Sequence, residues 1–227
     1  MRAAIFSDTH GNLVALDAVL ADLKAGGTPD LMIMAGDLAL LGPRPAETVD
    51  RIRGLNCLVL RGNTDQYVVD NTGGAHDWAR EQLGEERLCY LAGLPFAYSV
   101  QPAPGRELLI FHANPRNVED PLGPERPEDQ VQSLTAGTGA EVMAFGHVHI
   151  PYVRRVGDKT LFDIASVGLP RDGDRRAAYG IAEWAGGKWR LEHRRVPYDI
   201  DAVVADMRTC GMPNAEKNIN ILLSARY

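Results

Sequence analysis

Short apolar runs alternate with amphipathic stretches through the first third of the chain. Residues 3–7, 31–36 and 57–62 are almost entirely apolar and predict buried strands. Between them, leucines recurring at helical spacing predict a helix over 12–27, and a second helix is expected over 45–55. This strand–helix–strand order predicts a parallel sheet with right-handed crossovers.

The pattern changes in the second half, where strands follow one another through glycine-containing turns. The expected elements are a polar helix over 75–93, a hairpin over 97–112, strands within 141–149, 152–168 and 177–196, and a helix over 199–209 followed by a less regular tail. Residues 114–130 are rich in proline and charge and predict a long surface loop, a candidate lid. We therefore expect one α/β domain over 1–227, with two packed β-sheets and helices outside.

Composition narrows the class of protein. Hydrophobic residues make up 45% of the chain and charged residues 24%, which is typical of a soluble globular protein. No apolar run is long enough for a membrane span or a secretory signal, so no membrane partner is expected. The net charge of -6 argues against a stable nucleic-acid complex. Three scattered cysteines form no disulfide framework, which favours a reducing, cytoplasmic location. Homo-oligomerisation stays open.

Five apolar runs share one feature: each is followed directly by aspartate, asparagine or histidine. These residues are Asp8 and His10 after the first run, Asp37 after the second, Asn63 and Asp65 after the third, His112 after 107–111, and His147 and His149 after 141–145. Ligands bind at the carboxyl ends of strands in open α/β sheets, so these side chains are expected to converge. Glycines 36, 62 and 146 beside them predict close backbone approaches.

The residue types indicate a metal centre. Seven of these side chains are potential ligands (Asp8, His10, Asp37, Asn63, His112, His147 and His149), too many for one open tetrahedral zinc site. They suit two ions that share one carboxylate. Imidazole, carboxylate and amide groups without thiolate favour divalent transition metals, manganese first and then iron, nickel, cobalt or zinc. Asp65 is expected to orient or cap the backbone rather than to bind metal.

The ordered motifs Asp-x-His, Gly-Asp, Gly-Asn-x-Asp, a single His and Gly-His-x-His resemble the calcineurin-like metallophosphoesterase superfamily. They cover residues 8–149. Residues 166–181 and 194–199 further resemble its small bacterial stand-alone branch, which includes phosphodiesterases and diadenosine tetraphosphate hydrolases. The resemblance implies a four-layer αββα sandwich with two mixed sheets flanked by helices.

The resemblance also implies roles for individual residues. Asp8, His10 and His149 would hold one metal, Asn63, His112 and His147 the second, and Asp37 would bridge the two ions. A metal-bridging hydroxide would attack phosphorus while both ions stabilise the charge on the phosphoryl oxygens. Asp37 and Asn63 would thus take part in catalysis, and Asn63 also in binding. The substrate implied is a small phosphodiester or a nucleotide with a pyrophosphate bond.

The chain departs from this family at Thr64, where many members carry a histidine that assists the leaving group. Threonine cannot donate a proton as imidazolium does. Either the leaving group needs no protonation, or a donor comes from elsewhere, with His76 the candidate catalytic residue. Arg171 and Arg175 are candidates for gripping a substrate phosphate. A surface histidine and a solvated, charged turn are the competing interpretations of these three residues.

Two other functions remain open from the sequence. One is a phosphomonoesterase or protein-phosphatase-like activity; the other is a non-catalytic scaffold that keeps the fold for partner binding. A β-lactamase-like di-metal hydrolase is excluded because the chain has no His-x-His-x-Asp-His run. A second departure, Asp163 to Ala165 within residues 162–168, predicts an adjusted loop rather than a lost activity.

Overall fold

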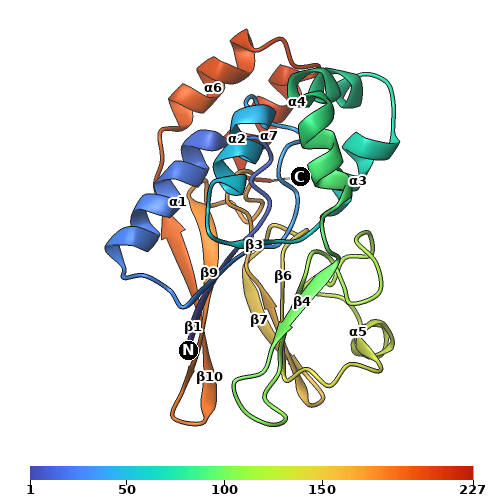
Figure 1. Ribbon diagram of the computed structural model, residues 1–227, viewed down its shortest axis with the longest axis vertical. Coiled ribbons are helices and arrows are strands. Elements are labelled where there is room, and N and C mark those ends of the chain that lie inside the picture. Colours follow the sequence, from blue (N-terminus) through green and yellow to red (C-terminus); the bar gives the residue numbers. More distant parts are fainter. Residues whose placement is uncertain (227) are drawn as a thin grey trace.

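The computed structural model describes residues 1–226 and contains two mixed five-stranded sheets packed face to face (Figure 1). The first sheet has the order β10-β9-β1-β2-β3, formed by Lys188–Val196, Ala177–Ala185, Arg2–Phe6, Leu31–Met34 and Leu58–Val59. The second has the order β4-β5-β6-β8-β7, formed by Ala97–Val100, Leu108–Phe111, Val142–Phe145, Lys159–Asp163 and Tyr152–Val156. The first sheet is parallel from β1 to β3 and antiparallel at β9 and β10, whereas the second is parallel over β5, β6 and β8 and has antiparallel β4 and β7 at its edges.

Helices cover the outer faces of both sheets, which gives the predicted four-layer order (Figure 1). The helices are α1 (Leu13–Ala25), α2 (Pro45–Arg53), α3 (Asn63–Asp70), α4 (Ala75–Ala92), α5 (Glu128–Thr135), α6 (Ile200–Thr209) and α7 (Ala215–Ser224). The first sheet packs against α1, α2 and α4, whereas α5 packs on the second. None of the helices described is long and apolar enough to cross a membrane.

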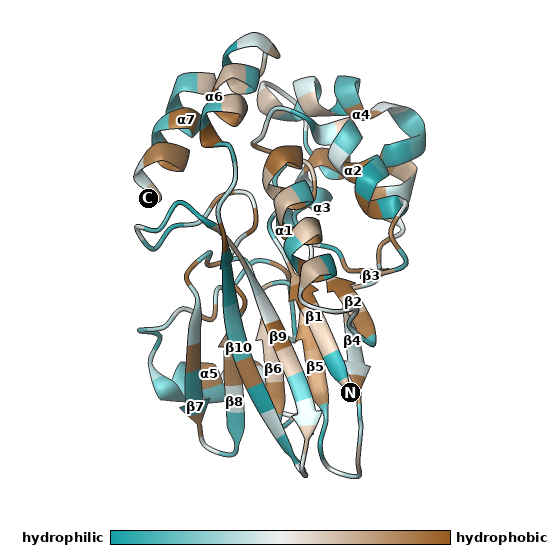
Figure 2. Ribbon diagram, turned by 90° about the vertical axis from the view of Figure 1, so that its left-hand side faces the viewer, coloured by the Kyte–Doolittle hydropathy of each residue, from teal (hydrophilic) through white to brown (hydrophobic). Residues whose placement is uncertain are grey.

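Alternation along β1 shows why its sequence is apolar from Ala3 to Phe6. Ala3 and Ile5 face the second sheet, while Ala4 and Phe6 pack under the helices, and all four are fully buried. A strand buried on both faces reads as a continuous apolar run. The edge strands β7 and β10 are instead hydrophilic along much of their length (Figure 2), which discourages edge-to-edge pairing.

Three helices lie where the sequence pattern predicted none. Helix α3 begins directly at Asn63, α5 occupies the end of the predicted loop and continues beyond it, and α7 forms in the tail. Each is 8 to 10 residues long, too short to be stable alone, so packing decides its conformation. In α7, Ile219 and Leu222 are fully buried in an apolar cluster with α6.

Candidate metal centre

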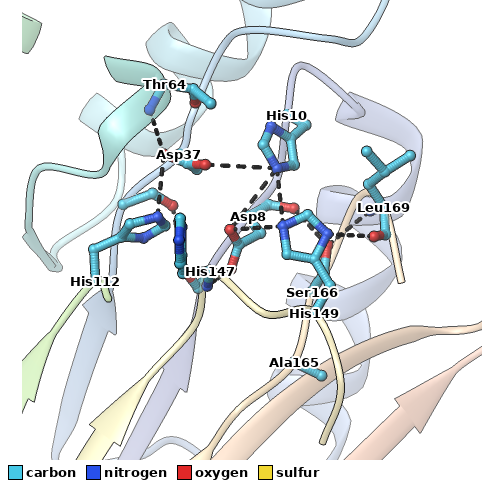
Figure 3. Close-up of polar contacts among 12 residues, drawn as sticks. Asp8, His10, Asp37, Thr64, His112, His147, His149, Ala165, Ser166 and Leu169 are labelled. Atoms are coloured by element: carbon cyan, nitrogen blue, oxygen red, sulfur yellow. Dashed lines mark hydrogen bonds and ion pairs between the residues drawn. The ribbon is translucent and has the colours of Figure 1, made fainter. Parts of the chain in front are cut away.

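The seven predicted ligands converge at the carboxyl ends of the parallel strands, and Figure 3 labels six of them, all but Asn63. They follow β1, β2, β3, β5 and β6, and the residue from β3 is the first of α3. A cavity of about 300 Å³ opens over them, with His10, Asp37, Asn63, His147 and His149 among its lining residues. All but His147 are buried.

One group of ligand atoms forms around His10, His149 and Asp8. The Nε2 atoms of His10 and His149 are 3.3 Å apart, and Asp8 Oδ1 lies 3.1 Å from His149 Nε2. The outer nitrogens are committed elsewhere: Nδ1 of His10 is 2.9 Å from the Leu40 carbonyl, and Nδ1 of His149 is 2.6 Å from the Leu169 carbonyl. Since these nitrogens donate to carbonyls, both Nε2 lone pairs face one another and Asp8.

A second group of atoms is built in the same way around Asn63. Its Oδ1 lies 2.9 Å from His112 Nε2 and 3.0 Å from His147 Nδ1. The remaining ring nitrogens again meet backbone carbonyls, His112 Nδ1 at 2.9 Å from Ala35 and His147 Nε2 at 2.9 Å from Glu119. With the outer nitrogens directed at carbonyls, Asn63 Oδ1, His112 Nε2 and His147 Nδ1 all point at one place.

Asp37 lies between the two groups. Its Oδ2 is 3.7 Å from His10 Nε2, and its Oδ1 is 3.4 Å from His112 Nε2. Each carboxylate oxygen therefore faces a different group, as a bridging ligand requires.

The residues fit metal cations on several independent grounds. Asp8 Oδ1 is a buried carboxylate oxygen with no hydrogen-bond partner, which is costly unless a cation neutralises it. The facing imidazole lone pairs have the same need. Two sets of side chains have ligand atoms close enough for one ion, namely Asp8, His10 and His149, and Asp8, Asp37 and His112.

Backbone strain accompanies this arrangement. Asp8, His10, Asp37, His147 and His149 all adopt positive φ, between 47° and 68°. Non-glycine residues rarely occupy this region, and each such residue costs on the order of 1–3 kcal/mol. Five strained residues in one cluster indicate that the surrounding fold enforces the direction of these side chains.

Burial sets the protonation states. It lowers the pKa of His10 to about 3 and that of His147 to about 4, so both imidazoles are neutral at pH 7. Burial raises the pKa of Asp37 to about 7, against the opposing effect of His112. Burial also opposes the ionisation of Asp8, but the neighbouring His149 imidazole holds the pKa of Asp8 below its usual range.

The glycines predicted to permit close approach do so. A Cβ at Gly62 would lie 2.1 Å from Asp37 Oδ1, and one at Gly146 would lie 2.2 Å from Asp8 Oδ2. A Cβ at Gly36 would lie 2.6 Å from the amide nitrogen of Gly62. None of these positions has room for a side chain.

Asp65 orients the backbone, as predicted. Its carboxylate accepts hydrogen bonds from the backbone N–H groups of Asp37 and Leu38 at 2.8 Å and of Gly62 at 2.9 Å. These bonds join the ends of β2 and β3, the strands that carry Asp37 and Asn63.

The structure separates the candidates for substrate contact. Thr64 lines the cavity and donates its backbone N–H to Asp37 Oδ1 at 2.9 Å, and Arg171 also lines the cavity. His76 is not among the lining residues; it lies near the start of α4 with its ring 6.5 Å from that of Tyr67. Arg175 lines a different hollow. Arg171 therefore lies at the cavity beside the metal ligands, whereas His76 and Arg175 do not line it.

Several residues that shape the site were missed from the sequence. The carbonyls of Ala35, Leu40, Glu119 and Leu169 fix the four imidazoles, and Tyr67 donates its hydroxyl to the carboxylate of Glu119. A backbone carbonyl gives no signal in residue identity. For Tyr67, only its position one turn after Asn63 could have indicated a role.

Comparison with known proteins agrees with this geometry. The model of the calcineurin-like phosphoesterase superfamily domain matches residues 1–187. The chain is 32% identical to the uncharacterised protein MJ0912 of Methanocaldococcus jannaschii, covering 87% of this chain and 88% of that protein. It is 26% identical to the phosphodiesterase YfcE of Escherichia coli, over 81% and 88% of the respective chains. A metallophosphoesterase structure from Sphaerobacter thermophilus superposes with a TM-score of 0.82 at 28% identity and 99% coverage of both chains. The chain belongs to the calcineurin-like phosphoesterase superfamily, in its small stand-alone branch.

Proposed function

We propose that this phosphoesterase is a two-metal enzyme that hydrolyses phosphodiester or nucleotide pyrophosphate bonds. The observation that carries the proposal is the position of Asp37, whose two carboxylate oxygens face two separate groups of lone-pair donors. Asp8, His10 and His149 would hold one ion, Asn63, His112 and His147 the other, and Asp37 both. Bound divalent ions would supply a water nucleophile at neutral pH and stabilise charge on the phosphoryl oxygens.

The donor set supports a transition metal in both positions. Imidazoles dominate it and thiolates are absent from it, which favours manganese, iron, nickel, cobalt or zinc over magnesium or calcium. The imidazoles of His10 and His147 remain neutral well below pH 7 because burial lowers the pKa of both. The protein therefore keeps these ligands ready to bind without first removing their protons.

A preference for diesters over monoesters follows from what faces the cavity. The histidines that line it each have their outer nitrogen on a backbone carbonyl, and Thr64 offers only a hydroxyl. Within residues 1–226, no lining imidazole is left over to protonate a poor leaving group. Substrates whose leaving group has a low pKa, such as a nucleotide phosphate, need no such donor. The Escherichia coli relative is named a phosphodiesterase, which supports the same preference.

Arg171 is the cationic side chain that reaches this cavity, and we assign it to a non-bridging oxygen of the scissile phosphate. Its backbone N–H donates to the His149 carbonyl at 3.1 Å, so the arginine is fixed to a ligand-bearing loop. An Arg171→Lys variant would keep the charge but lose two-point contact with the phosphate.

Hydrolysis of bis(p-nitrophenyl) phosphate and p-nitrophenyl phosphate tests the proposal, with chelated protein before and after addition of Mn²⁺. We expect metal-dependent cleavage of the diester, weak cleavage of the monoester, and loss of activity in Asp37→Ala and His147→Ala. Asp158→Ala is the matched control because that carboxylate is 90% exposed and remote from the site. Full activity in the Asp37 and His147 variants would refute the mechanism, and faster monoester cleavage would refute the diester preference.

A non-catalytic scaffold is the competing function, and metal analysis separates the two. A scaffold has no need to keep buried metal-ligand side chains and strained backbone at five positions. About two ions per purified chain support the enzyme, whereas a chain without metal and without activity would support the scaffold.

A further inference from the structure

A second hollow of about 230 Å³ adjoins the metal centre and is not part of the cavity described above. Its lining includes Arg61, Gln66, Phe96, Arg116 and Glu119. It lies between the segment that leads into α3 and the loop after β5, the same two segments that supply Asn63 and the carbonyl bound to His147. We call it the Arg61–Arg116 hollow.

The two arginines of this hollow have no anionic partner. Among the residues described, neither side chain makes a hydrogen bond or ion pair, and the Nε of Arg61 is buried without any acceptor. Elsewhere in the chain, guanidinium groups meet carboxylates, as Arg87 does with Asp50. Leaving a buried donor of a cation unpaired is costly, so a site of this kind favours an external anion.

The one acidic group of the hollow does not neutralise it. The carboxylate of Glu119 accepts the hydroxyl of Tyr67, and its backbone carbonyl meets His147. Two positive charges therefore face one negative charge that already has a donor. Half-buried Phe96 adds an aromatic face to the same wall.

The hollow lies within reach of a substrate held at the metals. Gln66 is three residues after Asn63 on α3, and side chains at this spacing are about 5–6 Å apart. On the other wall, Glu119 belongs to the hollow through its side chain and contacts His147 through its carbonyl at 2.9 Å. One residue on each wall thus joins the hollow to the metal centre.

We propose that the Arg61–Arg116 hollow binds a second phosphate group of the substrate, carried on the leaving group beyond the scissile phosphorus. The inference rests on the proposed function and narrows it: the preferred substrates are nucleotides with a chain of phosphates rather than simple diesters. Such a leaving group ends in a phosphate and departs without a proton, which also suits a cavity without an imidazole donor.

Paired kinetics test the hollow. The ratio of kcat/KM for diadenosine tetraphosphate to that for bis(p-nitrophenyl) phosphate is measured in the Mn²⁺-loaded protein and in Arg61→Gln and Arg116→Gln. We expect each substitution to lower this ratio by about tenfold, the usual effect of losing one charge-assisted hydrogen bond. Arg190→Gln is the matched control, because Arg190 is exposed on β10, at the edge of the first sheet opposite β3. An unchanged ratio in both variants would refute the assignment of the Arg61–Arg116 hollow as a phosphate site and leave the proposed phosphoesterase activity standing.

A binding measurement separates failure of the hollow from failure of the proposed function. Inorganic tripolyphosphate is titrated calorimetrically into the metal-free full-length chain and both variants. Suppose the protein hydrolyses neither ester, and tripolyphosphate binding weakens about tenfold in Arg61→Gln and Arg116→Gln. That result would support phosphate binding by the hollow and refute the proposed hydrolase activity. Binding that is equal in all three proteins would overturn the hollow whatever the activity.

Discussion

Gly62 lies so close to Asp37 that the substitution Gly62→Ala tests whether Asp37 must keep its position for the metal centre to form. A Cβ there would be 2.1 Å from Asp37 Oδ1 and 2.5 Å from Asp37 N, whereas ordinary contacts begin at 3.4 Å. The carboxylate could rotate away, but the backbone nitrogen cannot, so the ends of β2 and β3 must separate by about 1 Å. Overpacking of this kind costs about 1–3 kcal/mol.

For a chain of this length, that cost corresponds to a fall in Tm of roughly 2–12 °C for Gly62→Ala. The functional loss should be larger, because a ligand displaced by about 1 Å lowers the rate by about 100-fold. Thermal unfolding, metal content per chain and diester hydrolysis measure the three effects. Gly123→Ala is the control, since a Cβ there meets no atom within 4 Å. Unchanged metal content and Tm in Gly62→Ala would refute the assignment of Asp37 as the shared ligand.

Other perturbations have equally definite outcomes. Asp65→Asn replaces one of the oxygens that accept three backbone N–H bonds, and should lower the free energy of unfolding by about 2–3 kcal/mol in urea titrations. Leu222→Ala opens a cavity in the fully buried α6–α7 cluster and should cost about 2–5 kcal/mol in the same assay. Adding Mn²⁺ to metal-free protein at pH 7 should release protons from Asp37, whose pKa burial raises to about 7, and metal affinity should fall as the pH drops below that value. Calorimetry in two buffers of different ionisation enthalpy measures the release, and no release at pH 7 would contradict the protonation of Asp37.

The sequence predicts the layers of this fold well because burial on both faces leaves a plain signal. Strands β2 and β6 are apolar throughout, β1 is apolar after Arg2, and the helix over 12–27 is found as α1. The prediction fails where a short helix depends on its neighbours. Helix α7 contains only two fully buried apolar residues, Ile219 and Leu222, and these become informative once α6 is in place beside them.

The residues of the metal centre could also be predicted only in part. Asp, Asn and His directly after apolar runs can be recognised from residue type alone, so all seven converging side chains could be named from the sequence. The groups that orient these side chains could not be predicted, because each of the four imidazoles is fixed by a backbone carbonyl and every residue has one. Distance along the chain misleads in the same way. His76 is only 13 residues after Asn63, yet α3 carries the chain away from the cavity, whereas Glu119, 56 residues after Asn63, reaches His147 through its carbonyl.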